Sequence, residues 1–276
     1  MPSSKRLQSY DESRAVQSRV AKKHAKLALK AFEKPWRQLL ALCQDPESQH
    51  RLNWLQQQFA RGQRGAMESA QAEIDTASFL IDAGFTLSFV KETETRTADL
   101  ECYYDHDRLF VEVTVIVPAE GDREKITGAR PVVRFEEKTL DIWQDGLVKR
   151  MLARIRKKAE QLVDYCAPVV LALTLVHQEY DKAGKHLARK LDLDLQQLGG
   201  VITNALGNVP QLSGILLTLW NMQPALSQSA IRLSNVAIGE WVFEPRGRSR
   251  VRCLAWNPRA NYPLETEVSQ AFHRLL

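Results

Sequence analysis

One glutamate stands in the middle of a stretch that is otherwise apolar. Residues 109–117 read LFVEVTVIV, which is the run with the strongest strand character in the chain. Side chains alternate between the two faces of a strand, so Glu112 and Thr114 share one face while only aliphatic side chains occupy the other. A carboxylate in such a run must be paired, hydrogen-bonded or bound to a cation, or its pKa rises until it is neutral. Glu112 is therefore the first candidate for chemistry.

A second carboxylate comes from the strand before it. Asp99 opens a strand predicted over residues 99–104, with Glu101 on its own face. The short turn at 105–107 predicts an antiparallel hairpin, and such a hairpin brings Asp99 near Glu112. Two carboxylates and a neighbouring backbone carbonyl, here that of Val113, form the oxygen-rich ligand set that Mg²⁺ or Mn²⁺ prefers. The hairpin is thus predicted to hold a divalent metal ion.

The segment TADLECYYDHDRLFVEVTVI resembles the signature of the PD-(D/E)xK nuclease superfamily. In that signature an aspartate opens one strand and Glu-x-Lys lies on the next. Asp99 matches the aspartate, Glu112 matches the acidic residue, and Thr114 stands where the lysine would be. The resemblance covers about residues 67–176 and implies a restriction-endonuclease-like α/β fold, a central mixed sheet flanked by helices. It also implies one or two divalent ions that activate water for phosphodiester hydrolysis.

Thr114 raises the question of what replaces the lysine. In active relatives that lysine orients the nucleophilic water and offsets developing negative charge, and a threonine supplies no charge. The best replacement is Lys157 on the following helix, in one stripe with Gln161 and Tyr165, which resemble a Gln-x-x-x-Tyr element of the superfamily. Weaker candidates are Arg154 and Lys91.

The resemblance also points to a glutamate on the helix before the first strand. Glu73 falls there, on the apolar side of its helix, where a merely solvated glutamate would be out of place. An auxiliary metal ligand and one partner of an ion pair are two readings of Glu73 that stay open.

Simpler readings accompany the other candidates. An aspartate at the start of a strand can make a turn hydrogen bond, although the context of Glu112 favours the metal site for Asp99. Glu112 itself could form a buried ion pair with an arginine or lysine. The stripe of Lys157, Gln161 and Tyr165 lies away from the apolar stripe of its helix, which favours a solvated helix face.

The remaining elements are predicted from hydrophobic periodicity and from turn residues. Helices are expected over 67–83, closed by Gly84, over about 140–165 and over about 183–206. Strands are expected over 85–90, 169–176 and 214–220, then a closing pair at 241–243 and 251–256, followed by a short C-terminal helix. In chain order this gives helix, three strands, helix, strand, helix and strand, which is typical of a mixed α/β fold.

Charge divides the chain near residue 65. Residues 1–65 hold 13 Lys and Arg against 5 Asp and Glu, a net charge of +8, whereas the remaining 211 residues hold 25 against 28, a net charge of −3. We expect a basic helical N-terminal arm over 1–65, joined by the linker RGQRG to an α/β domain over 66–276. Basic helices of this kind suit nucleic-acid phosphates. The expected contacts, besides a cleft in the core, are Lys22, Lys23, Lys26 and Lys30.

Composition narrows the classes of protein. No apolar run approaches the roughly 20 residues that span a bilayer, and the charged start is followed by no apolar stretch of a signal peptide. The four cysteines and six histidines form no cluster with metal-ligand spacing, which argues against a zinc site or disulfides. The sequence therefore predicts a cytoplasmic protein.

Together these residues predict a metal-dependent nuclease acting on nucleic acid, with DNA expected over RNA. The alternative is a degenerate protein that keeps the fold and binds nucleic acid or a protein partner without cleaving. A third reading is an α/β protein in which Glu112 is only a buried ion pair.

Overall fold

The computed structural model describes most of the chain. Its described residues are 29, 32–63, 65–91, 98–117, 142–176, 179–180, 186–187, 189–220, 222–225, 234–241, 250–274 and 276. The expected phosphate contacts at Lys22, Lys23, Lys26 and Lys30 lie outside these residues.

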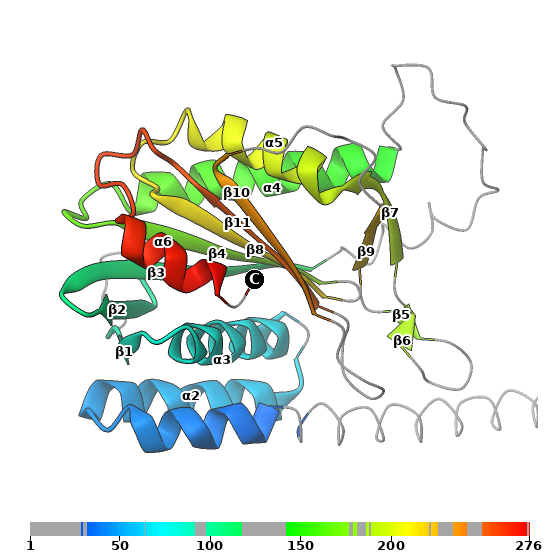
Figure 1. Ribbon diagram of the computed structural model, residues 1–276. Helices are drawn as coiled ribbons and strands as arrows, with labels where there is room; N and C mark the ends of the chain where they lie inside the picture. The colour runs from blue at the N-terminus through cyan, green and yellow to red at the C-terminus, as the bar shows by residue number, and fades with distance from the viewer. Residues whose placement is uncertain are drawn as a thin grey trace, which may run out of the picture.

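A seven-stranded mixed sheet forms the centre of the molecule (Figure 1). In spatial order its strands are β1 (Thr86–Phe89), β2 (Leu100–Tyr104), β3 (Asp107–Ile116), β4 (Val169–Val176), β8 (Gly214–Trp220), β11 (Arg250–Trp256) and β10 (Val236–Trp241). The pairs β3–β4 and β4–β8 are parallel, and the other neighbours are antiparallel. Every residue of β4 and β8 is buried, as expected for parallel strands covered on both faces.

Helices cover both faces of the sheet (Figure 1). On one face lie α2 (Pro46–Arg61), α3 (Ala66–Asp82), α6 (Thr266–His273) and a further helix at residues 32–42. On the other lie α4 (Ile142–Gln161) and α5 (Leu195–Leu206). Two small sheets complete the described elements: β5 (Glu179–Tyr180) with β6 (His186–Leu187), and β7 (Arg189–Asp194) with β9 (Met222–Ala225). The α/β architecture with a helix-flanked mixed sheet agrees with the prediction.

The two faces of β3 carry different hydrophobic cores, as its alternation predicts. Leu109 and Val111 pack with α2, α3 and α6, whereas Phe110 and Ile116 pack with α4 and α5. Glu112 and Thr114 alternate with Val111 and therefore share the face of Phe110.

Residues 32–61 belong to this core rather than to a detached arm. Leu52, Leu55 and Phe59 of α2 are buried in one cluster with Ile74 and Leu80 of α3. The ring of Phe32 stacks on that of Phe59 with centroids 4.1 Å apart. The hydrophobic core is thus continuous across residue 65, where the sequence suggested a boundary.

Local signals set the bounds of α2, the helix that reaches the candidate site. Asp45 caps its start by accepting a hydrogen bond of 2.8 Å from the Ser48 amide, and Pro46 occupies the first turn. Gly62 ends the helix with φ of 66°, a left-handed conformation that favours glycine. Gly84 ends the next helix in the same way, with φ of 96°, as predicted.

One predicted helix is too long. The segment expected to be helical over about 183–206 contains the strands β6 and β7, and α5 starts only at Leu195. Residues 189–194 read RKLDLD, an alternation that suits a strand and that a search for helical periodicity overlooks. The last strand of the sheet also begins earlier than expected, since β10 runs over Val236–Trp241. Among the described helices none is both long and apolar enough to cross a bilayer.

Candidate active site

The candidate site lies at a step in the sheet, where β2 stops and β3 continues. Leu100 pairs with Val111, so Asp99, one residue earlier, faces Glu112, one residue later. Beyond this point β3 pairs with β4, and no other described strand lies along it. The hairpin therefore brings the two carboxylates together as predicted, at an edge of β3.

Asp99 is fixed by the backbone of β3. Its Oδ2 accepts a hydrogen bond of 2.7 Å from the amide of Val113, and its own amide donates to the carbonyl of Val111 at 3.1 Å. The N–H and C=O of one strand residue point to the same neighbour, so the Val113 carbonyl also faces the start of β2. Asp99, Glu112 and this carbonyl are the expected oxygen set.

Arg51 of α2 joins Asp99 to Glu73 of α3. Its guanidinium binds both carboxylate oxygens of Glu73, with Nε 2.8 Å from Oε1 and Nη2 3.0 Å from Oε2. Nη2 also lies 3.2 Å from Oδ1 of Asp99. The Glu73 side chain is 6% exposed and that of Arg51 15%, so this pairing is shielded from solvent. Of the two readings left open for Glu73, the ion pair is the one seen.

Lys158 of α4 reaches the site from the other face of the sheet. Its Nζ is hydrogen-bonded to Oε1 of Glu112. The side chains are 19% and 7% exposed, respectively. A primary amine thus contacts the acidic residue on the strand that lacks the motif lysine.

Burial makes the site costly to ionise. Desolvation, then the charge of Asp99, raises the pKa of Glu73 to about 8 against the opposing effect of Arg51. Desolvation and Asp99 likewise raise the pKa of Glu112 to about 7, although Lys158 opposes the shift. Glu112 also contributes to the shift of Glu73, so the carboxylates interact with one another. Among the described residues, Arg51 and Lys158 are cations that contact these acidic groups.

Tyr165 positions the start of β2. Its hydroxyl accepts a hydrogen bond of 2.5 Å from the amide of Ala98, next to Asp99. Its ring packs edge-on against Phe110, with centroids 4.6 Å apart. Burial, followed by repulsion from Glu112 and Asp99, raises the pKa of the hydroxyl. Gln161, the other residue of this element, is half-buried at the end of α4.

Lys157, the predicted replacement for the motif lysine, is not the residue seen in contact with Glu112. Its side chain is exposed, and the adjacent Lys158 contacts Glu112 instead. Consecutive residues differ by about 100° around a helix, so only one of the two can face the sheet. Arg154 is half-buried on α4, and Lys91 pairs with Glu47 at 3.8 Å. Thr114 is buried at 6% exposure on β3.

Sequence reasoning missed Arg51 and Lys158 for different reasons. Arg51 is 22 residues from Glu73 and 48 from Asp99, on a helix assigned to the separate arm. The sequence feature that could have indicated Arg51 is its position next to Leu52 on α2, at the border of the apolar face of that helix. Lys158 lies in the stripe next to that of Lys157. Finding it from sequence would have required the rotation of α4 about its axis to within one residue.

Two carboxylates and one backbone carbonyl, rather than three carboxylates, are the oxygens to compare with the ligands that Mg²⁺ or Mn²⁺ prefers. No group of three His, Cys, Asp or Glu side chains in the described part of the chain is placed to hold an ion. Mg²⁺ is commonly held by one or two carboxylates, with water and substrate phosphate completing its octahedron. Asp99, Glu112 and the Val113 carbonyl are the oxygens of this kind at the site. Both oxygens of Glu73 are bound to Arg51, and those of Asp99 accept hydrogen bonds from Arg51 and from the Val113 amide.

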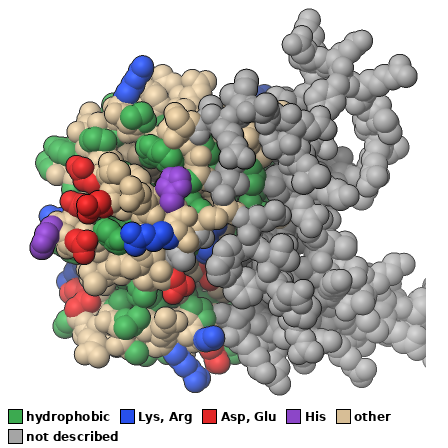
Figure 2. Space-filling model, viewed as in Figure 1, with side chains coloured by type: hydrophobic (Ala, Val, Ile, Leu, Met, Phe, Trp, Pro, Cys, Tyr) green, Lys and Arg blue, Asp and Glu red, His purple; other side chains and the backbone are tan. Residues whose placement is uncertain are grey.

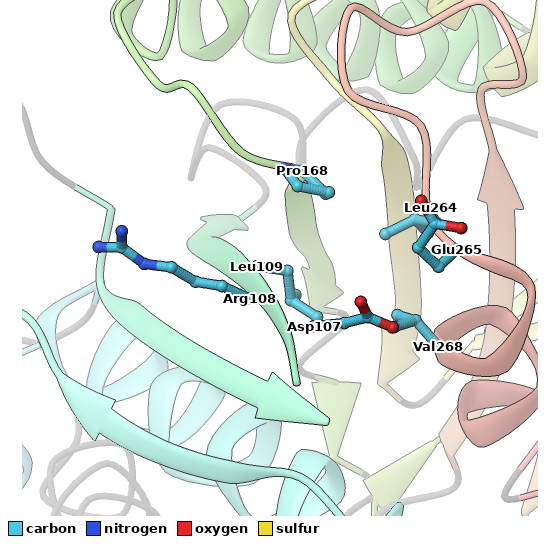
Figure 3. Close-up of a pocket in the computed structure, with 7 residues that line it drawn as sticks. All are labelled: Asp107, Arg108, Leu109, Pro168, Leu264, Glu265 and Val268. Carbon is cyan, nitrogen blue, oxygen red and sulfur yellow. The ribbon is translucent and has the colours of Figure 1, made fainter. Parts of the chain in front are cut away.

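Two pockets lie away from the candidate site. A cavity of about 120 Å³ at the beginning of β3 is lined by Asp107, Arg108, Leu109, Pro168, Leu264, Glu265 and Val268 (Figure 3). A second, of about 380 Å³, lies between the end of β11 and α6. Neither of these two pockets contains a candidate residue.

Comparison with known proteins adds no family assignment: no family model, no curated protein and no solved structure matches the chain significantly.

Proposed function

We propose that this protein is a metal-dependent nuclease that hydrolyses phosphodiester bonds of nucleic acid, with DNA as the expected substrate. The proposal rests chiefly on the contact between Lys158 and Glu112. It restores an ammonium group to a carboxylate pair that resembles the PD-(D/E)xK signature but has Thr114 in the lysine position.

A purely structural ion pair accounts less well for the site. One buried carboxylate needs one cation, but here Glu73, Asp99 and Glu112 share Arg51 and Lys158. Desolvation by burial, and then the charge of Asp99, raise the pKa values of Glu73 and Glu112 in the fold, so ionising all three carboxyl groups is costly. Clustered, perturbed carboxylates are typical of functional sites.

Each residue has a distinct role in the proposed reaction. Asp99, Glu112 and the Val113 carbonyl would hold the ion, which when bound supplies an activated water and Lewis-acid stabilisation of the phosphate. Lys158 orients the attacking water and offsets negative charge as the phosphate is attacked. Tyr165 is a positioning residue, because its hydroxyl fixes the backbone next to Asp99.

Arg51 favours a second candidate, a degenerate nuclease that binds without cleaving. Its guanidinium already neutralises Asp99 and Glu73, so a divalent ion would enter beside a positive charge. A protein that no longer needs the metal could keep this arrangement. The two candidates differ in cleavage and not in fold.

A digestion assay separates them. The purified chain is incubated with single- and double-stranded DNA and RNA in Mg²⁺ or Mn²⁺, and Glu112→Gln is compared with wild type. We expect cleavage that EDTA abolishes and that Glu112→Gln lowers by at least 100-fold, because the neutral amide is a weak metal ligand.

Glu101→Gln is the matched control, because Glu101 is a nearby carboxylate on β2 that pairs with Arg108 at 2.7 Å. It should cleave at close to the wild-type rate. Cleavage that is equal in wild type and Glu112→Gln would show a contaminating nuclease, and no cleavage in any condition would favour the degenerate candidate.

A further inference from the structure

Helix α4 is the most basic element among those described. Between Gly146 and Gln161 it carries six Lys and Arg and a single acidic residue, Glu160. In contrast, acidic and basic side chains are mixed on the face of the molecule shown in Figure 2. A run of cations on one helix with so few acidic neighbours calls for an acidic partner.

The cations of α4 occupy two different flanks. Residues four apart lie on one flank, so the flank whose Lys158 reaches Glu112 also carries Arg154 and Arg150, with Lys157 beside them. We call Arg150, Arg154 and Lys157 the α4 basic flank. Arg156 lies two residues from Arg154, about 200° around the helix, and Lys149 is near it on the opposite flank.

The α4 basic flank leads away from the candidate site. A helix that connects two parallel neighbouring strands runs back along them, so residues before Lys158 lie toward the carboxyl end of β3. Each step of four residues advances about 6 Å along the helix axis. The flank therefore extends the positive charge of Lys158 along the edge of β3 where β2 has stopped.

Arg154 and Lys157 are not engaged in ion pairs with acidic residues of the described chain. Arg154 is half-buried and Lys157 is exposed. Among the described residues no acidic side chain neutralises these two charges, and charge complementarity selects a polyanion that reaches the carboxylate site.

We propose that the α4 basic flank binds the sugar–phosphate backbone of the nucleic-acid strand and guides it to Asp99 and Glu112. This assignment rests on the proposed nuclease function and names residues for the contacts expected on the core, in addition to those expected on Lys22, Lys23, Lys26 and Lys30. Contacts of this kind hold a strand in place without reading its sequence.

Two double variants with the same change in charge test the assignment. Arg154→Gln/Lys157→Gln removes two cations from the α4 basic flank, and Lys149→Gln/Arg156→Gln removes two from the opposite flank. Binding of fluorescein-labelled single-stranded and duplex DNA is measured by anisotropy in EDTA, where no cleavage occurs, over a range of salt concentrations. Thermal melts establish that both variants are folded.

We expect the first variant to bind at least tenfold more weakly and the second within about twofold of wild type. The slope of log affinity against log salt should fall by roughly 0.7 per lost contact for a single strand and 0.9 for a duplex. Equal weakening of both variants, or no wild-type binding at all, would overturn the assignment. If binding depends on the α4 basic flank but no metal ion supports cleavage, the assignment of the flank holds and the nuclease function is ruled out.

Discussion

The chemistry of the site comes down to five side chains with unbalanced charge. Glu73, Asp99 and Glu112 bring three carboxylates, and Arg51 and Lys158 bring two cations. Under the proposed function, a divalent ion held by Asp99 and Glu112 and an incoming phosphate would offset each other's charge at this position.

At the scale of single residues, a substitution of Lys158 best distinguishes an active nuclease from a degenerate one. Lys158→Met should lower the rate of cleavage by at least 100-fold, because the developing charge on the phosphate loses its ammonium partner. Single-turnover cleavage at saturating DNA measures the chemical step directly.

The control for that change is Lys34→Met, which removes an exposed lysine from the helix at residues 32–42. It should cleave at the wild-type rate. A Lys158→Met protein that cuts as fast as wild type would assign the missing lysine's role to another group.

The sequence predicts the placement of individual side chains well where the alternation along a strand determines it. Asp99 faces Glu112 because a hairpin with a short turn leaves little choice of register. The lysine was placed one position early, at Lys157, because a helical stripe read from sequence is uncertain by one residue at its edge. The partner of Glu73 depends on tertiary packing between α2 and α3, which no local pattern encodes.

At the scale of elements, α2 connects the N-terminal part of the chain to the site. Its apolar side packs on α3, and Arg51, on the border of that side, reaches Glu73 and Asp99. The guanidinium also lies 4.5 Å from the ring centre of Trp54. Helix α2 thus places a cation at the site and helps fix Asp99.

Arg51→Met should destabilise the fold by about 3–5 kcal/mol, because it leaves the buried carboxylate of Glu73 without its partner. Arg51→Met/Glu73→Leu should recover much of this loss, since both charges are then gone. The measurement is chemical denaturation at pH 8.

Arg61→Met is the matched control, an exposed arginine in the last turn of the same helix, and should change stability by less than about 0.5 kcal/mol. Equal stability of Arg51→Met and Arg61→Met would mean that Glu73 does not depend on Arg51.

Elements were predictable in proportion to the strength of their pattern. The bounds of β4 and β8 match the prediction to the residue, because continuous apolar runs between turns allow one interpretation. The helix expected from Ala183 was wrong in its N-terminal half, because β7 within it alternates like a strand and pairs with β9, which lies more than 30 residues later.

At the scale of the whole molecule, the site joins both helical layers across the sheet. Arg51 comes from the layer of α2 and α3, and Lys158 from the layer of α4 and α5. Ionisation of the site should therefore be measurable in the stability of the entire fold.

The metal-free protein should lose stability as the pH rises from about 5 to 8. The folded state holds protons on Glu112 and Glu73 more tightly than the unfolded chain does, because their pKa values are raised from 4.5 to about 7 and about 8. Carboxyl pKa values that are raised in the folded state stabilise the fold at low pH. This stabilisation is lost as the pH rises past the pKa values of the folded state.

Each titrating carboxyl group contributes a slope of up to about 1.4 kcal/mol per pH unit. Glu112→Gln cannot titrate at this position, so its free energy of unfolding should depend less steeply on pH than that of wild type. Urea unfolding in EDTA at pH 5, 6, 7 and 8 makes the comparison. Parallel curves for the two proteins would contradict the raised pKa of Glu112.

The layered architecture was predictable from the order of helices and strands, but the division at residue 65 describes charge better than packing. Net charge reports the surface, whereas Leu52 and Phe59 show that α2 is part of the core. Amphipathic spacing on α2 was visible in the sequence; the face it packs against was not.

The most direct test of the account is the position of a divalent ion. A crystal grown with Mn²⁺ is measured at a wavelength where manganese scatters anomalously, with an Asp99→Asn/Glu112→Gln crystal as control. We expect a peak within about 2.2 Å of oxygens of Asp99 and Glu112 in wild type, none in the control, and Lys158 still beside Glu112. An empty site at millimolar Mn²⁺, with Arg51 unchanged between Glu73 and Asp99, would contradict a metal-dependent nuclease.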